Sequence, residues 1–259
     1  MSTILYDQIV FGPIHSRRLG ISLGMNLLPT DGKVCSFDCL YCECGFNKDR
    51  KTNHRMPTRE EVREALRERL TRMQAEGIAP DVITFAGNGE PTLHPDFESI
   101  IADTIATRDA FFPKAKIAVL SNATQLHKES VVRALSRVED NILKFDSILD
   151  SRIQQLDRPN QSGFCFARLL EQLKQFEGNL IIQTMFLKGE YEGVTFDNTT
   201  DEEIDALIEA YKQIKPSEVM IYSIDRKTPA TGLVKIEKSE LDVIEDKISK
   251  AGIKVMAAS

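Results

Sequence analysis

Three cysteines of this chain have a spacing that suits an iron–sulfur cluster. Cys35, Cys39 and Cys42 fall in the run Cys-Ser-Phe-Asp-Cys-Leu-Tyr-Cys. A 4Fe–4S cluster offers one ligand position at each iron, so three cysteines leave one iron open. An open iron can bind another molecule, whereas a cluster with four cysteine ligands mainly carries electrons. The spacing therefore favours a cluster at which chemistry occurs.

Other uses of these cysteines stay open at this point. Structural zinc usually takes two Cys-x-x-Cys-like pairs, or one such pair with paired histidines, and the four histidines here stand singly in the sequence. Cys44 offers a fourth thiolate, although a Cys-x-Cys pair reaches two corners of a tetrahedron awkwardly. The odd number of cysteines, five, argues against a disulfide framework and indicates a reducing compartment.

A second candidate motif follows the apolar run 81–87, which we expect to form a buried strand. The chain continues there as Gly87-Asn88-Gly89-Glu90-Pro91. The two glycines let a ligand approach the backbone closely, and Glu90 places a carboxylate at the end of the strand. The alternative is a plain turn with Glu90 in solvent. The segment lacks the GxGxxG pattern of a dinucleotide site.

Further polar residues lie near the ends of later expected strands. Lys144 and Asp146 share one face of the strand 141–147, where they either point into a barrel or satisfy each other as an ion pair. Gln183 shares a face of the strand 179–187 with Met185, which we expect to pack in the core. The remaining candidates are Ser121, Asn122, Tyr222, Asp225 and the loop arginines Arg158 and Arg226.

Strand-like and helix-like patterns alternate along the chain. Thr58 with Glu61 predicts a capping box at the first helix, and Thr200 and Ser239 are expected to cap two later helices. Strict alternation favours parallel strands with crossover helices, in a partial β/α barrel or an open doubly wound sheet. Either fold puts its chemistry at the carboxyl ends of the strands. The expected strands are 21–28, 81–87, 116–122, 141–147, 179–187 and 218–225, with a short one at 253–257, and the other helices are 95–111, 128–138 and 164–176.

Composition limits the classes of function. The chain has 259 residues, of which 42% are apolar, and its net charge is −6. The acidic balance argues against a broad nucleic-acid-binding surface. The first residues lack a secretory signal, and no stretch is apolar enough to cross a bilayer. We therefore expect a soluble, cytoplasmic protein without a membrane partner.

The motifs resemble those of a known family. CSFDCLYC resembles the cluster motif of the radical S-adenosylmethionine (SAM) superfamily, including Tyr41 before the third cysteine, and GNGEP resembles the glycine-glutamate motif of its second strand. The segments FGPIHSRRLGISLGMNLLP, TFAGNGEPTLHP, LDRP and IYSIDR resemble the iron–sulfur oxidoreductase branch that is related to wyosine-base synthases. The resemblance runs from about Phe11 to Arg226.

This resemblance implies a fold, cofactors and a reaction. It implies a partial (β/α)6 TIM-like barrel with parallel strands, in a single domain over 1–259 with an N-terminal extension (1–20), a barrel core (21–226) and a C-terminal helix and short strand (227–259). SAM would bind the open iron and be cleaved reductively, giving a 5′-deoxyadenosyl radical that removes hydrogen from a substrate. A donor such as flavodoxin or ferredoxin would supply the electron.

The resemblance also assigns residues. Cys35, Cys39 and Cys42 would bind the cluster. Candidates for the reaction cavity are Lys144, Gln183 and Tyr222. The residues expected to contact SAM are Tyr41 beside the adenine, Gly87, Asn88, Gly89 and Glu90 at the methionine amine, and Ser121 and Asn122 at the ribose or carboxylate.

One departure from the family narrows the expectation. Wyosine-base synthases carry further cysteines for a second cluster, and only Cys44 and Cys165 remain here. Cys165 falls in an expected helix as a small buried residue. We therefore expect one cluster and a substrate that is a small molecule, a protein or, less favoured, RNA. Two alternatives are an activase that installs a glycyl radical on a partner enzyme, and a non-enzymatic electron carrier or redox sensor in which Cys44 is the fourth ligand.

Overall fold

The protein is built on one open, mostly parallel sheet. The structure, a computed structural model, describes residues 4–16, 19–160 and 163–258. Six parallel strands lie side by side in the order in which they occur along the chain, with an antiparallel strand beyond β2 and a parallel one beyond β9. They are β1 (Val10–Ser16), β2 (Gly20–Met25), β3 (Val82–Phe85), β4 (Lys116–Ser121), β5 (Asp140–Lys144), β6 (Ile181–Met185), β9 (Glu218–Tyr222) and β11 (Val255–Ala258).

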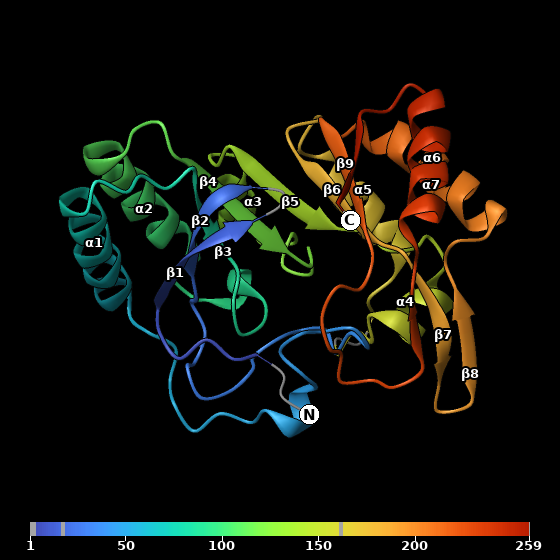
Figure 1. The fold of residues 1–259 in the computed structure, drawn as a ribbon, viewed down its shortest axis with the longest axis horizontal. Helices are drawn as coiled ribbons and strands as arrows, with labels where there is room; N and C mark the ends of the chain where they lie inside the picture. Colours follow the sequence, from blue (N-terminus) through green and yellow to red (C-terminus); the bar gives the residue numbers. More distant parts are fainter. Residues whose placement is uncertain (1–3, 17–18, 161–162, 259) are drawn as a thin grey trace.

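The expected partial barrel is confirmed. Strands β1 and β11 form the two edges of the eight-stranded sheet, so the barrel stays open between them. Figure 1 shows the curved sheet with helices on its outer side. The helices are α1 (Arg59–Ala75), α2 (Phe97–Phe111), α3 (Glu129–Leu135), α4 (Asp150–Leu156), α5 (Phe166–Lys174), α6 (Asp201–Ile214) and α7 (Lys238–Lys250), with 3-10 turns η1 (Asn47–Asp49) and η2 (Pro91–Leu93). No helix in the described ranges is long and apolar enough to cross a membrane.

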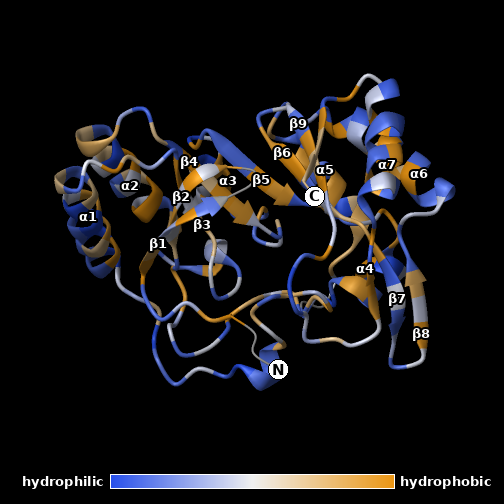
Figure 2. Cartoon of the chain, viewed as in Figure 1, coloured by the Kyte–Doolittle hydropathy of each residue, from blue (hydrophilic) through white to orange (hydrophobic). Residues whose placement is uncertain are grey.

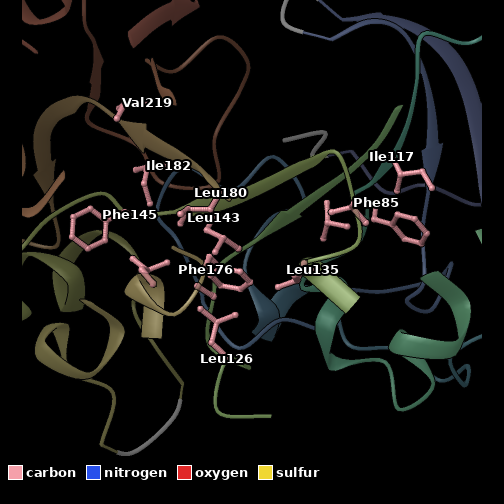
Figure 3. Packing of buried hydrophobic residues seen from close by; sticks show 14 of the residues in the cluster. Phe85, Ile117, Leu126, Leu135, Leu143, Phe145, Phe176, Leu180, Ile182 and Val219 are labelled. Atoms are coloured by element: carbon pink, nitrogen blue, oxygen red, sulfur yellow. The ribbon is translucent and has the colours of Figure 1, made fainter. Parts of the chain in front are cut away.

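Alternation along the parallel strands separates two apolar clusters. Residues such as Ile83, Leu143 and Ile182 face the helices and form the main core, part of which Figure 3 shows. Figure 2 shows strands with many hydrophobic residues in the middle of the view, between helices at the left and right that mix hydrophobic and hydrophilic residues. The neighbouring residues face the inside of the barrel and pack together in its amino-terminal half. We call this second cluster the barrel floor: Val82, Ala118, Ile142, Ile181 and Met220.

Two expected helix starts are confirmed and a third is wrong. The Thr58 hydroxyl accepts a hydrogen bond from the Glu61 amide at 3.2 Å, and the Glu61 carboxylate accepts one from the Thr58 amide at 2.7 Å. Thr200 caps α6 in the same way through the Glu203 amide. Ser239 does not cap α7, because the last extended residue is Glu237 and the helix begins at Lys238.

Cys165 also departs from expectation. It is a half-buried, extended residue just before α5 rather than a buried residue inside that helix. The reason is local: Asp150 at the start of α4 accepts a hydrogen bond from the Phe166 amide at 2.6 Å, and this contact fixes where α5 begins.

Several short elements were absent from the sequence-based expectation. Strand β1 and helix α4 are two of them. A second, three-stranded sheet is a third, with β10 (Leu233–Lys235), β7 (Leu187–Tyr191) and β8 (Val194–Asp197) in that order. The β7–β8 hairpin, at the lower right of Figure 1, turns through Glu192 and Gly193, which both have positive φ.

Candidate cofactor and iron–sulfur site

The cysteine loop is docked on the glycine motif. Between β2 and α1 the chain runs across the carboxyl-terminal end of the sheet, in the lower part of Figure 1. The Val34 amide donates to the Asn88 carbonyl at 3.0 Å, and the Glu90 amide donates to the Val34 carbonyl at 3.1 Å. Gly89 between them has a φ of +131°, and a Cβ there would lie 1.9 Å from the Val34 oxygen. The motif therefore positions the cysteines, and glycine is required for the contact.

The three cysteines occupy one short, tightly turned loop. The Cys42 amide donates to the Cys39 carbonyl at 3.1 Å. Among the described residues, no three Cys, His, Asp or Glu side chains are already gathered around a single metal position. The thiols are nevertheless close enough to influence one another. Burial raises the pKa of Cys35 to about 12, and burial with the charges of Asp157 and the other two cysteines raises the pKa of Cys39 despite Lys144.

Lys33 is a buried cation inside the same loop. Its Nζ donates to the Gly45 carbonyl at 2.7 Å and lies 3.5 Å from Asp38. Burial alone would lower the pKa of Lys33, but attraction to the thiolates of Cys42, Cys35 and Cys39 outweighs burial and raises it. Sequence reasoning missed this residue. The available signal was a lysine two positions before the first cysteine, the one Lys or Arg between Arg18 and Lys48.

Cys42 and Cys44 interact directly. A hydrogen bond from the Cys44 thiol, together with the Lys33 charge, lowers the pKa of Cys42 against the opposing effect of burial. The Cys44 Sγ is also 3.3 Å from the Gly87 carbonyl oxygen, the second acceptor within reach of its single thiol proton. Cys44 therefore lies beside the cysteine that completes the motif, buried between the loop and β3.

Glu90, Ser121 and Asn122 are brought together at the ends of β3 and β4. The Glu90 carboxylate accepts hydrogen bonds from the Ser121 hydroxyl at 2.8 Å and from the Asn122 amide at 2.7 Å. It is 2% exposed, and burial raises its pKa despite these bonds. The Asn122 Nδ2 lies 3.6 Å from the Cys35 sulfur. Glu90 is therefore neither solvated nor free, since it ties the two strand ends beneath Cys35.

Asn88 has a structural partner that the sequence did not reveal. Its side-chain oxygen accepts from the Tyr6 amide at 2.9 Å, and its Nδ2 donates to the carbonyls of Tyr6 and Pro29 at 2.8 and 2.9 Å. Tyr6 in turn stacks on Phe11 with ring centroids 3.7 Å apart. Asn88 thus anchors the N-terminal segment over the glycine motif, and its predicted contact with SAM stays a prediction.

A cavity of about 430 Å³ lies against the cysteine loop. Its size falls in the usual range of sites for small molecules and cofactors. Ser22 and Thr84, whose hydroxyl oxygens are 2.8 Å apart, line its wall from β2 and β3. The cavity also brings together seven of the candidate positions, and Met185, which was expected in the core, lines it as well. The seven are Tyr41, Cys42, Gly87, Gln183, Tyr222, Asp225 and Arg226.

A buried polar cluster holds Tyr41. The Tyr41 hydroxyl donates its one proton to Asp146, and its oxygen also lies within hydrogen-bond distance of Asp157, at 3.1 Å. Lys144 pairs with both carboxylates and lies 4.4 Å from the Tyr41 ring centroid. Burial, reinforced by Asp146, raises the pKa of Asp157 to about 7, while the two carboxylates outweigh burial and raise that of Lys144. Of the two alternatives for Lys144 and Asp146, the structure shows the ion pair, and Asp157 is a member that the sequence did not suggest.

The two loop arginines occupy different surroundings. Arg226 forms an ion pair with Glu43 at 2.6 Å, and both residues line the cavity. The Arg158 guanidinium instead lies 5.1 Å from the Phe46 ring centroid and 5.9 Å from that of Tyr191. The structure therefore places Arg226 at the cavity and Arg158 in an aromatic contact under the β7–β8 hairpin.

The family model described as the Radical SAM superfamily matches residues 30–192, which contain the cysteine loop and the glycine motif. The chain belongs to the radical SAM superfamily. Membership implies a 4Fe–4S cluster and SAM as cofactors, and an external reductant. The three thiols, the Lys33 cation beside them and the adjoining cavity fit such a group.

Curated relatives agree with this membership. The chain is 30% identical to a UPF0026 protein from Helicobacter pylori over 84% of this chain and 67% of that one. It is 29% identical to a UPF0026 protein from Methanocaldococcus jannaschii over 96% and 74%. A protein named GTPase Obg from Brachyspira hyodysenteriae is 30% identical over 86% of this chain, but the chain spans only 31% of its length.

Solved structures share the radical SAM fold at low sequence identity. A radical SAM methyltransferase from Sphaerobacter thermophilus has a TM-score of 0.69 at 14% identity, over 92% of this chain and 65% of that one. SuiB from Streptococcus suis, bound to S-adenosylmethionine, has a TM-score of 0.63 at 16% identity, over 91% and 49%. A TYW1 structure with a lysine-pyruvate adduct has a TM-score of 0.60 at 13% identity, over 88% and 73%.

Proposed function

We propose that this protein is a radical SAM enzyme that holds one 4Fe–4S cluster through Cys35, Cys39 and Cys42. It cleaves SAM to methionine and a 5′-deoxyadenosyl radical, which abstracts hydrogen from a substrate. The observation that carries the proposal is the docking of the cysteine loop on the glycine motif through Val34. This contact puts the last cysteine and Gly87 on the wall of one cavity.

The chain's own residues bind and orient the cofactors. When bound, the cluster supplies one electron to the sulfonium of SAM, and an external donor such as flavodoxin or ferredoxin restores it. The backbone at Gly87 is open to the cavity and is expected to receive the methionine amine. Tyr41 faces the same cavity, and the two aspartates that bind its hydroxyl fix its ring in place. We assign that ring to the adenine.

The remaining walls limit access of water to the radical. The five apolar side chains of the barrel floor pack against Leu19 and Leu120, which line the cavity. From the side, the N-terminal segment contributes Ile4 and Tyr6 to the lining, and the Arg226–Glu43 ion pair lies near them. Gln183 and Tyr222 on β6 and β9 are our candidates for contact with the substrate.

The proposal treats 1–259 as one domain. Strand β1, from the expected N-terminal extension, and β11, from the C-terminal segment, support this view because each adds an edge to the barrel sheet. The substrate is left unassigned. The net charge of −6 favours a small molecule or a protein over RNA.

The test is anaerobic reconstitution followed by reduction with dithionite in the presence of SAM. We expect 5′-deoxyadenosine and methionine by chromatography, with about four irons per chain, the stoichiometry of one such cluster. Cys39→Ala loses both products, whereas Cys44→Ala keeps them. Cluster loss in Cys44→Ala would instead favour the electron carrier with four cysteine ligands, and absence of 5′-deoxyadenosine from the loaded wild type would refute the proposal.

A further inference from the structure

The position of Lys33 relative to the cysteines has a consequence for electron transfer. The side chain is 1% exposed and starts two residues before Cys35. Its ammonium ends at the carbonyl of Gly45, three residues after Cys42. The cation therefore spans the loop that carries all three thiols, and it interacts electrostatically with each of them.

Little negative charge from the protein compensates this cation. Asp38 is the one carboxylate paired with it in the described part of the chain, at 3.5 Å, and the Asp38 Oδ1 also accepts a hydrogen bond from the Asn47 amide at 2.7 Å. Lys144, on the other side of Cys39, differs because it pairs with two buried carboxylates. The charge of Lys33 is therefore less neutralised by carboxylates than that of Lys144. More of its electrostatic attraction acts on the thiolates.

A negatively charged cluster supplies the missing counter-charge. A cubane core of charge 2+ with three thiolates carries one net negative charge, and reduction adds a second. A nearby buried cation stabilises the reduced form more than the oxidised form, because Coulomb attraction grows with the charge and is weakly screened in the interior. Net charge and hydrogen bonding around the sulfurs are established means by which proteins set cluster potentials.

We propose that Lys33 is a positioning residue for electron transfer, whose fixed charge raises the reduction potential of the cluster held by Cys35, Cys39 and Cys42. This inference rests on the proposed function, because it requires the cluster at those cysteines. Lys33 eases the delivery of the first electron from the external donor. It takes no part in bond cleavage itself.

The test is a redox titration of the reconstituted protein without SAM, monitored by electron paramagnetic resonance of the reduced cluster. Lys33→Met removes the charge and keeps most of the length of the unbranched side chain. At a potential fixed at the wild-type midpoint, we expect the ratio of reduced to oxidised cluster to fall about tenfold, a shift of about 59 mV for one electron. Lys33→Arg keeps the charge, and its ratio stays within about twofold.

Two further variants separate electrostatics from a bracing role. Asp38→Asn removes the partner charge and keeps the shape, so the same ratio should rise, by about threefold. Lys116→Met is the matched control, because Lys116 lies at the opposite end of the sheet and pairs with Asp140. In Lys116→Met the ratio of reduced to oxidised cluster should equal that of the wild type.

The outcomes are distinct. If Lys33→Met loses cluster but the remaining cluster keeps the wild-type midpoint, Lys33 only braces the loop and the inference is refuted. If Lys33→Met holds no cluster, Asp38→Asn decides, since an unchanged or lowered ratio there also refutes the inference. The proposed function is refuted by a different result, the absence of 5′-deoxyadenosine from the reconstituted wild-type protein. The two proposals can therefore fail independently.

Discussion

The two ends of the barrel are stabilised in different ways. At the amino-terminal end, the barrel floor consists of one apolar side chain from each of five neighbouring strands. At the carboxyl-terminal end, polar contacts hold the loops: Glu90 joins β3 to β4, and Asn88 holds the N-terminal segment. Apolar packing inside the barrel therefore characterises one end, whereas at the other end specific hydrogen bonds act together with a smaller apolar cluster that includes Leu40, Phe46 and Leu187.

This difference predicts a separation of phenotypes. Substitutions in the floor remove apolar contacts far from the cysteines, so they should lower the free energy of unfolding and leave cofactor binding intact. Substitutions at the cavity end disturb the loop that carries the thiols, so they should reduce cluster content before they reduce the stability of the sheet. Each variant below challenges one side of this separation.

The largest effect is expected at Gly89. In Gly89→Ala the new Cβ would overlap the Val34 carbonyl at 1.9 Å, in a backbone region that costs a side chain about 1–3 kcal/mol. The cysteine loop must then leave β3, and we expect iron content after reconstitution to fall by about tenfold or more. The measurement is iron and sulfide per chain, with circular dichroism to report on the sheet.

Gly77→Ala is the control for this substitution. Gly77 also has a positive φ, +70°, but nothing lies within 4 Å of a Cβ placed there. It ends α1 far along the chain from the cysteines, so the variant should lose about 1 kcal/mol of stability and no iron. Equal iron loss in both variants would show that general instability, rather than loop docking, governs cluster content.

The next largest effect concerns the floor. Ile142→Ala removes a side chain that is 2% exposed, and we expect a loss of about 2–5 kcal/mol in urea unfolding. Val243→Ala, on the exposed side of α7, should stay within about 0.5 kcal/mol of wild type. SAM affinity of the loaded Ile142→Ala protein should match that of wild type, and a large change there would contradict the separation of the two ends.

The two ends of the barrel also differ in how much of them the sequence predicted. The strands were readable because short apolar runs alternate with helix-like patterns along the chain. The floor was not predicted, because both faces of these strands are apolar and buried. The three cysteines and the glycine motif were readable because their spacing is fixed by the chemistry they serve. Short elements such as the β7–β8 hairpin were missed, since two-residue turns through Glu192 and Gly193 leave a weak local signal.

Long-range polar partners were the least predictable part of the site. Asp157 reaches Tyr41 across 116 positions, and Asn88 reaches Tyr6 across 82. Neither contact leaves a pattern in neighbouring residues, because the fold alone brings the partners together. Lys33 is similar, since its role depends on how the loop closes onto Gly45.

Asp157 gives a smaller effect that depends on pH. Its pKa is raised from 3.8 to about 7, mainly by burial. Between these values the folded state keeps a proton that the unfolded state has lost, so stability falls as pH rises through this window, by up to about 1.4 kcal/mol per pH unit. Asp157→Asn removes this dependence. Unfolding measured across the window should therefore decline less steeply in the variant, and identical slopes would place the proton elsewhere in the cluster.

The smallest effect is expected for the Arg226–Glu43 ion pair, which joins the end of β9 to the cysteine loop at the surface. The two side chains are 51% and 42% exposed, so water and salt screen their attraction. A double-mutant cycle with Arg226→Met and Glu43→Gln should give a coupling of about 0.2–1 kcal/mol in unfolding, and less at high salt. A coupling energy well above this range that does not fall at high salt would contradict this expectation. It would mean that the ion pair also stabilises the carboxyl-terminal end of the barrel.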